Sequence, residues 1–245
     1  DMMNERAEEL GMKDTHFVNC CGLDTDGHLT TAYDIALMSR ELITKYPQIH
    51  TYSTIWMENI THTTKRGTEE FGLTNTNKLI KQYQGCNGIK TGFTTDAGYC
   101  LSASATREDT HLIAVALGCE TSQIRNTEVS KLLDYGFANF ETCVIAEKGQ
   151  AIEEIRVENG QPQTLKAVTA DRITCLTEKG GKGDISSKAK IDEKVHLPLK
   201  KGDKVGVLNV YQGDEKIAEY PLVAEISVEK ASFGELAKRL VKKIF

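Results

Sequence analysis

The segment "GIKTGFTTDAGY", Gly88–Tyr99, is the part of this chain that indicates its fold most clearly. Its opening, "GIKTGF", is typical of a short strand, and residues 96–98 are typical of a tight turn. The segment that follows, "GYCLSASAT", predicts a second strand. The sequence therefore predicts an antiparallel hairpin at this point, and its first strand carries the tripeptide Lys90–Gly92.

The tripeptide Lys90–Gly92 has side chains suited to binding a carboxylate. On an edge strand, the lysine supplies a positive field and the threonine a hydroxyl donor, while the glycine leaves the backbone open to an extended ligand. The next backbone N–H, that of Phe93, would then point at a developing oxyanion. Three residues of this kind also occur by chance in a strand that ends in a turn. The tripeptide alone therefore leaves both interpretations open.

The elements around this hairpin predict a mixed α/β domain. A third strand, "HLIAVALGC", is continuously apolar, which is typical of burial on both faces. Apolar residues at helical spacing predict a helix over residues 126–139. Upstream, we expect a helix over residues 2–10 and another from Thr31 to about Lys45, the second opened by a capping box. Residues 51–80 predict a hairpin or irregular strands.

Past Cys143 the sequence changes to short alternating strands separated by Gly, Asn and Asp turns, as expected for a small all-β domain. The domain boundary is expected near residues 142–147. We therefore expect one domain over residues 1–142, an all-β domain over residues 143–230 and a separate helix over residues 231–245.

The last segment, "FGELAKRLVKKIF", predicts an amphipathic helix. At helical spacing one face carries the apolar residues Phe233, Leu236, Ala237, Leu240, Val241 and Ile244. The opposite face carries Glu235, Lys238, Arg239, Lys242 and Lys243. An apolar face backed by cations fits a helix that lies in an anionic membrane surface. The alternative is a helix docked on its own protein.

Composition narrows the function classes. The chain has 245 residues with 40% hydrophobic and 27% charged residues, as in ordinary globular domains. Its formal net charge is -5, and an acidic chain argues against nucleic acid as the main partner. No apolar run in it reaches the roughly 18 residues that a membrane span needs.

Neither a metal nor another cofactor is expected. The seven cysteines include no C-x-x-C pair and no H-E-x-x-H helix accompanies them, so most are expected to be buried apolar residues rather than ligands or disulfides. The segment Asp24–Gly27 begins like a calcium loop, yet Ile35 stands where a bidentate glutamate is needed. His16 and His28 are expected to be structural hydrogen-bonding residues in that loop, and His50 and His62 have no partners at ligand spacing.

Four segments together resemble a known family. The stretches "THFVNCCGLDTDGHLTTAYDIALMSRELI", "NTNKLI", "GIKTGFTTDAGYCLSASATRED" and "LLDYGFANFE" are similar, in order and spacing, to the D-alanyl-D-alanine carboxypeptidases of the penicillin-binding protein 5 type. The resemblance runs along the whole chain. It implies an N-terminally incomplete α/β (α+β) domain of the β-lactamase/transpeptidase-like fold, then a small all-β domain and a C-terminal amphipathic helix.

The resemblance also implies an activity and a set of site residues. The family consists of serine peptidases that remove the terminal D-alanine of peptidoglycan stem peptides through an acyl-enzyme. They bind β-lactam antibiotics and act on the outer face of the cytoplasmic membrane. By this resemblance Lys90 shapes the electrostatics of the site, Thr91 binds the terminal carboxylate, Gly92 leaves room and Phe93 supplies an oxyanion N–H. Arg125 helps to attract the carboxylate, although it also fits a solvated residue near the start of a helix.

The sequence departs from the family at the nucleophile. The family carries the motif S-x-x-K, with the serine nucleophile and its lysine base, and the motif S-x-N. In this chain the S-x-x-K at Ser187–Lys190 lies in a polar loop without the helix that would activate a serine, and S-x-N is absent. In the family both motifs precede the first helix of this chain, so we expect the chain itself to be inactive.

Two alternatives remain open at this point. One is a non-catalytic peptidoglycan-binding or scaffolding homologue, which would have kept the fold and lost the nucleophile. The other is a β-lactamase, which shares the catalytic fold but not the all-β domain or the C-terminal helix. A Ser-His-Asp hydrolase is disfavoured because the chain has no G-x-S-x-G motif.

Overall fold

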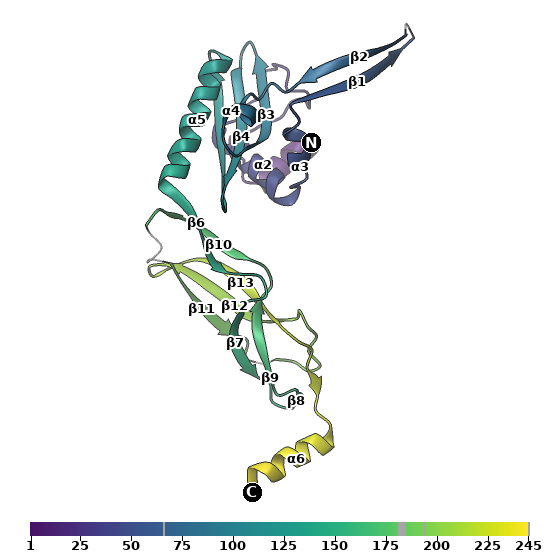
Figure 1. Cartoon of the computed structure of the whole chain (residues 1–245), viewed down its shortest axis with the longest axis vertical. Helices are drawn as coiled ribbons and strands as arrows, with labels where there is room; N and C mark the ends of the chain where they lie inside the picture. Colours follow the sequence, from purple (N-terminus) through teal and green to yellow (C-terminus); the bar gives the residue numbers. More distant parts are fainter. Residues whose placement is uncertain (66, 181–184, 194, 245) are drawn as a thin grey trace. The chain divides into compact units, whose positions relative to one another are not determined.

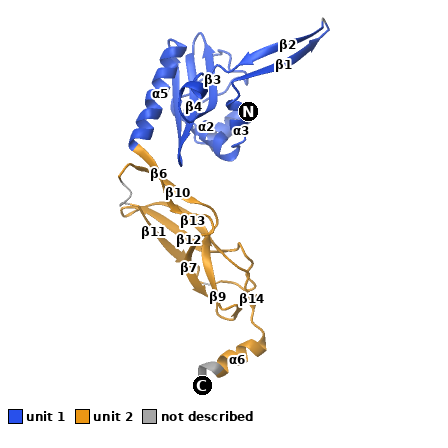
Figure 2. Cartoon of the chain, in the orientation of Figure 1, with its two compact units in different colours: residues 1–139 blue, residues 140–245 orange. Residues whose placement is uncertain are grey.

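The computed structural model describes residues 1–65, 67–180, 185–193 and 195–244, and the side chains of residues 242–244 are not part of that description. The chain forms two compact units, residues 1–139 and residues 140–245 (Figure 2). The first is a mixed α/β unit and the second is built mainly of strands (Figure 1). Each unit is described by itself.

Unit 1 is organised around an antiparallel sheet of three strands, in the order β3 (Cys86–Thr94), β4 (Gly98–Arg107), β5 (Thr110–Cys119). The predicted hairpin is therefore confirmed, with Thr91 opposite Leu101 and Phe93 opposite Tyr99. The central strand β4 is the most deeply buried, because both of its neighbours and the helices cover it. Strand β3 lies at an edge of the sheet, as its proposed role requires.

Two helices cover opposite faces of this sheet. On one face, Val129, Leu133 and Phe137 of α5 (Ser122–Asn139) pack against the fully buried Leu101 and Ala103. On the other face, the Ser102 hydroxyl shares a 2.7 Å hydrogen bond with Ser39 of α2 (Ala32–Lys45). Successive residues of β4 thus contact different helices, as the alternation of a strand requires.

Helix boundaries follow their capping residues. The Thr31 hydroxyl accepts a 3.1 Å hydrogen bond from the Asp34 backbone N–H at the start of α2, which confirms the predicted N-cap. Helix α5 begins at Ser122, earlier than the predicted residue 126. The reason is that the Thr121 hydroxyl accepts a hydrogen bond from the Ile124 N–H, whereas the apolar pattern used for the prediction starts only at Val129.

The remaining elements of unit 1 are short or peripheral. They are α1 (Met2–Glu9), α3 (Ile49–Ser53), α4 (Leu79–Gln82) and the hairpin of β1 (Met57–Thr64) with β2 (Gly67–Thr74). The hairpin is one of the two predictions made for residues 51–80. Its described residues are exposed on both strands, and Figure 1 shows it extending away from the sheet.

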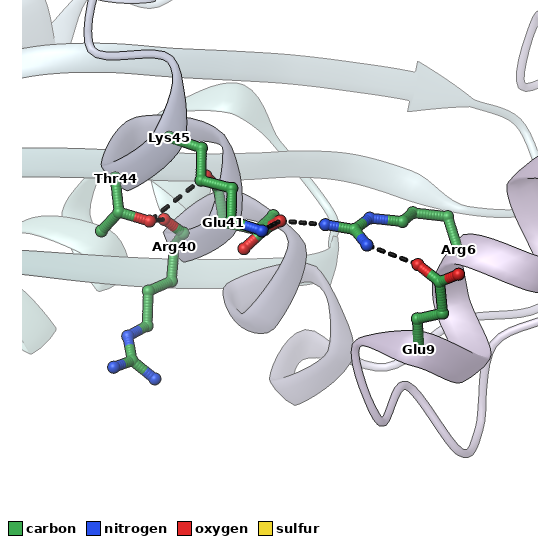
Figure 3. Close-up of polar contacts among 6 residues, drawn as sticks. All are labelled: Arg6, Glu9, Arg40, Glu41, Thr44 and Lys45. Atoms are coloured by element: carbon green, nitrogen blue, oxygen red, sulfur yellow. Dashed lines mark hydrogen bonds and ion pairs between the residues drawn. The ribbon is translucent and has the colours of Figure 1, made fainter.

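A surface network of charges joins α1 to α2. Arg6 pairs with Glu9 and with Glu41, and Lys45 pairs with the same Glu41 carboxylate at 2.7 Å (Figure 3). The Lys45 ammonium and the Arg6 guanidinium hold the pKa of Glu41 below its usual value. The network orients α1 against α2. Because its groups lie at the surface, salt screens the attraction between them.

Unit 2 has a five-stranded antiparallel sheet and two smaller ladders. The large sheet has the order β11 (Ile185–Ile191), β12 (Lys204–Gln212), β13 (Glu215–Ala224), β9 (Thr164–Thr169), β7 (Ala151–Arg156). The smaller ladders pair β6 (Phe140–Ala146) with β10 (Ile173–Glu178), and β8 (Gly160–Gln161) with β14 (Glu229–Lys230). Its core includes the fully buried Val210, Leu222 and Val228. Helix α6 (Phe233–Ile244) follows.

The structure corrects two predictions about single residues. Ser187 and Lys190 lie on strand β11 and not in a loop, and residues three apart on a strand point to opposite faces, so the two side chains cannot work together. The polar segment before them includes residues 181–184, which lie outside the described residues. The expectation that most cysteines are buried is wrong, because only Cys86 and Cys143 are. Cys20 and Cys21 are exposed in a loop, and Cys100, Cys119 and Cys175 are partly exposed on their strands.

The core of unit 2 provides a test of the fold. Leu222 of β13 is fully buried and Ile217 of the same strand is 42% exposed. We expect Leu222→Ala to destabilise unit 2 by about 2–5 kcal/mol, because it removes buried methyl groups and leaves a cavity. Urea unfolding followed by circular dichroism measures this change.

Ile217→Ala is the matched control, with an expected effect within about 0.5 kcal/mol. The single tryptophan, Trp56, lies in unit 1 and its fluorescence serves as an internal reference. An equal loss of stability in the two variants would contradict the assignment of the core.

Candidate active site

A cavity of about 620 Å³ lies beside the edge strand β3. Its walls come from β3, from the segment before α4, from the first turn of α5 and from the loop at Cys21. The lining residues are Cys21, Gly22, Thr76, Lys78, Lys90, Thr91, Gly92, Phe93, Thr94, Tyr99, Ser122, Arg125 and Asn126. All five predicted site residues therefore meet at one cavity, although Arg125 is far from the others in sequence.

Thr91 is the most enclosed of the β3 residues at this cavity, with 8% of its surface exposed. Its hydroxyl shares a 2.6 Å hydrogen bond with the Thr76 hydroxyl. A hydroxyl of this kind rotates freely unless a partner holds it, so the contact with Thr76 restricts the orientation of the Thr91 hydroxyl. The neighbouring Lys90 is exposed, and its ammonium donates a hydrogen bond to the Thr91 carbonyl.

Thr76 itself is held by the two asparagines beside it in the sequence. The Asn75 amide donates to the carbonyls of Ser53 and Ile55 at 3.1 and 3.0 Å. The Asn77 amide is buried and donates to the Gly88 carbonyl at 3.2 Å, which ties this segment to β3. The sequence analysis noted the segment "NTNKLI" but not Thr76 as a site residue. The two neighbouring asparagines could have indicated Thr76, because asparagine side chains often fix the conformation of a loop.

Arg125 lies in the first turn of α5 and is 4% exposed. Its guanidinium donates to the Asn126 side-chain oxygen at 3.0 and 3.2 Å and to the Cys100 carbonyl at 3.4 Å. Both acceptors are neutral, and none of the ion pairs among the described residues includes Arg125. Burial lowers the pKa of this group, but a guanidinium remains cationic. The alternative of a solvated residue at a helix start is therefore wrong.

The charges at the cavity have one sign. Lys78, Lys90 and Arg125 line it, and the lining residues include no aspartate or glutamate. A concave site with cationic groups concentrates the field and attracts anions. Since Arg125 is fixed by hydrogen bonds and Thr91 is oriented by Thr76, a bound carboxylate would meet donors already in place.

Phe93 and Gly92 complete the β3 wall. The Phe93 ring is 58% exposed and lies 4.4 Å from the Tyr99 ring, centroid to centroid, so the two rings form an apolar side of the cavity. An added Cβ at Gly92 would lie 3.7 Å from the Cys100 Cβ, which is an ordinary contact. Packing inside the protein therefore does not require glycine at position 92, and any need for it comes from the cavity side.

The cavity does not contain a serine activated by lysine. Ser122 is its only lining serine, and the described residues show no hydrogen bond between a serine and a lysine side chain at this place. Over the same described part of the chain, no group of three or more His, Cys, Asp or Glu side chains is arranged to hold a metal ion. The arrangement has the groups to bind and orient an anionic ligand.

The contact between Thr76 and Thr91 can be measured by a double-mutant cycle. We expect Thr76→Val and Thr91→Val each to destabilise unit 1, with a coupling energy of about 0.5–1.5 kcal/mol, because Thr91 is buried and its hydroxyl has Thr76 as its partner. Urea unfolding followed by Trp56 fluorescence reports this unit. The exposed pair Thr63 and Thr68, whose hydroxyls are 3.2 Å apart, is the control and should show coupling near zero. Equal coupling in both pairs would mean that Thr76 does not hold Thr91.

Comparison with known proteins agrees with this geometry. Residues 1–121 match the model of the D-alanyl-D-alanine carboxypeptidase family, and residues 140–230 match the model of the C-terminal domain of penicillin-binding protein 5. The chain is 37% identical over 238 residues to the D-alanyl-D-alanine carboxypeptidase DacF of Bacillus subtilis, a match that covers 97% of this chain and 60% of that protein.

Solved structures show the same similarity. Penicillin-binding protein 5 of Haemophilus influenzae aligns with a TM-score of 0.68 and 29% identity, over 94% of this chain and 65% of that one. The peptidoglycan synthesis regulatory factor PBP3 of Streptococcus pneumoniae aligns with a TM-score of 0.72 and 25% identity, over 94% of this chain and 69% of that one. The chain spans about 60% of the length of curated relatives that it matches. Its two matched regions and the arrangement of its strands and helices place it in the D-alanyl-D-alanine carboxypeptidase family, with the C-terminal domain of penicillin-binding protein 5.

Proposed function

We propose that the cavity beside β3 is the carboxylate-binding half of the active site of a serine-type D-alanyl-D-alanine carboxypeptidase. The observation that carries this proposal is Arg125, a buried cation whose partners are only a neutral amide and a carbonyl. A buried charge is stable only when it is well hydrogen-bonded, and a bound carboxylate adds the opposite charge that this site lacks. The terminal carboxylate of a peptidoglycan stem peptide is such a ligand.

Each β3 residue then has a specific task. Thr91 donates its hydroxyl to the carboxylate, and Lys90 adds positive potential beside it. The substrate backbone lies along the open edge of β3 at Gly92, as an added strand would. The Phe93 N–H stabilises the oxyanion that forms when the penultimate carbonyl is attacked. The Phe93 and Tyr99 rings exclude water from one side.

The nucleophile and its base come from the part of the relatives that this chain does not span. In the complete enzyme, the serine hydroxyl attacks the carbonyl of the penultimate D-alanine, the terminal D-alanine leaves, and water hydrolyses the resulting ester. A β-lactam acylates the same serine, which is consistent with relatives named as penicillin-binding proteins. Residues 1–245 alone therefore bind substrate or antibiotic weakly at most and do not turn over.

Labelling with a fluorescent penicillin tests this proposal. We expect no covalent label on residues 1–245 and a stable label on the longest polypeptide that the gene encodes. In that longer protein, Arg125→Leu should lower the rate of acylation about 10–100-fold, because it removes a charge-assisted contact to the carboxylate.

Lys81→Leu is the control for this substitution, since it removes an exposed cation that does not line the cavity. Equal rates for Arg125→Leu and the wild type would contradict the role of Arg125. A longer protein that binds stem peptides but takes no label would support the scaffolding homologue instead. Covalent labelling of residues 1–245 would show that the chain contains its own nucleophile.

We propose that the first domain binds the substrate and that the C-terminal helix holds the protein at the membrane. Residues 1–142 form the substrate-binding portion of the catalytic domain, residues 143–230 form the all-β domain, and residues 231–245 lie on the outer face of the cytoplasmic membrane.

In α6, the side chains of Phe233, Leu240 and Val241 are 87%, 65% and 57% exposed. Arg239 donates to the Gly160 carbonyl at 3.0 Å, which holds the helix at one end of the all-β domain. Among the described residues no helix is long and apolar enough to cross a bilayer.

Binding to vesicles tests the role of α6. We expect the double variant Phe233→Ser, Leu240→Ser to lose at least about 10-fold in partitioning to vesicles with anionic lipid, because it removes the apolar surface that inserts. Sedimentation with the vesicles measures the bound fraction. Ile217→Ser, at an exposed apolar site on β13, is the control and should bind like the wild type. Unchanged binding of the double variant would show that α6 does not anchor the chain.

A further inference from the structure

Two cysteines of unit 2 lie directly opposite each other on paired strands. Cys143 of β6 and Cys175 of β10 are register partners in an antiparallel ladder, between the pairs Val144 with Thr174 and Thr142 with Leu176. Directly opposite Cα atoms in such a ladder are about 4.5 or 5.5 Å apart. A disulfide needs Cα atoms about 4.4–6.8 Å apart. The backbone therefore already satisfies the requirement, whichever kind of pair this is.

The side chains also face each other. Cys143 is 7% exposed and Cys175 is partly exposed, and the Cys175 thiol is hydrogen-bonded to that of Cys143. Burial and the neighbouring thiol raise the pKa of Cys175. The two thiols are thus neighbours across the ladder, and that of Cys175 is partly accessible to a reagent from solvent.

No other cysteines in the described part of the chain have this arrangement. Cys119 of β5 lies opposite Tyr99 and not opposite Cys100, because a bulge shifts the β4–β5 register between Tyr99 and Leu101. Cys20 and Cys21 are adjacent in the sequence, where a disulfide is strained. Cys86 is buried on β3, and its thiol donates to the Gly88 carbonyl.

We infer that Cys143 and Cys175 are a site of reversible oxidation, which forms a disulfide between β6 and β10 by exchange with a low-molecular-weight disulfide. The thiolate of one cysteine attacks the external disulfide, which gives a mixed disulfide and releases one thiol. The thiolate of the second cysteine then attacks the mixed disulfide, which closes the internal bond and releases the second thiol. The two protons lost by the cysteines are taken up by the two released thiolates.

The location of the pair gives the bond a structural consequence. Strands β6 and β10 form a two-stranded ladder of their own, outside the five-stranded sheet, and β6 begins at the first residue of unit 2. The chain between the two cysteines contains β7, β8 and β9. A disulfide here joins the start of unit 2 to its interior and closes that loop in the unfolded chain. Because the closed loop lowers the conformational entropy of the unfolded state, the disulfide stabilises the folded unit. This inference does not depend on the proposed carboxypeptidase activity.

The experiment uses residues 1–245, equilibrated in the folded state with oxidised glutathione. Free thiols are then blocked with iodoacetamide and the protein is digested with trypsin under non-reducing conditions. Trypsin cleaves after Lys148 and after Arg172, so Cys143 and Cys175 are on separate peptides, residues 132–148 and 173–179. We expect these two peptides to be recovered as one species that dithiothreitol separates. We also expect the melting temperature to rise by about 4 °C or more on oxidation.

Cys175→Ser removes the linked peptide and the rise in melting temperature, while Cys119→Ser is the matched control and keeps both. Circular dichroism shows that each variant is folded. Recovery of Cys143 and Cys175 as carbamidomethyl or glutathione adducts from the folded wild type would overturn the inference. Equal amounts of the link in urea and in the folded state would also overturn it, because the register would then contribute nothing.

Discussion

The pairing of β3 with β4 is the constraint on which the candidate site depends. The register sets Thr91 opposite Leu101, and Leu101 is fully buried against α5. A shift by one residue would turn every side chain of β3 to the other face, so the packing of Leu101 also determines where Thr91 points. Because β3 is an edge strand, the backbone beside Thr91 stays available to a ligand.

The binding chemistry comes from elements that are distant in the sequence. The segment around Thr76 supplies the hydroxyl that orients Thr91, and α5 supplies Arg125. The position of α5 is set by its own apolar face, through Val129 and Leu133, and Arg125 lies one turn before Val129 on the same side of the helix. The packing of the helix therefore also places the guanidinium at the cavity. There, neutral hydrogen-bond acceptors offset part of the free-energy cost of burying its charge.

The two units differ in how completely they bury their apolar residues. Unit 2 surrounds its core with strands on several sides, whereas in the described residues the unit 1 sheet has three strands and two unpaired edges. Most of the large apolar side chains that are exposed belong to unit 1, among them Leu29, Tyr33 and Phe71. Among the described residues, unit 1 therefore leaves more large apolar side chains in contact with solvent than unit 2 does.

The sequence by itself determined the hairpin at Gly88, the capped helix at Thr31, the all-β character after Cys143 and the residue types proposed to bind a carboxylate. These features depend on local patterns: a period of two, a capping hydroxyl and turn residues. It did not determine the exposure of Arg125, the contact between Thr76 and Thr91, or the opposition of Cys143 and Cys175. Each of these depends on packing and register between segments distant in the chain, which no local pattern records, and only the tertiary structure decided them.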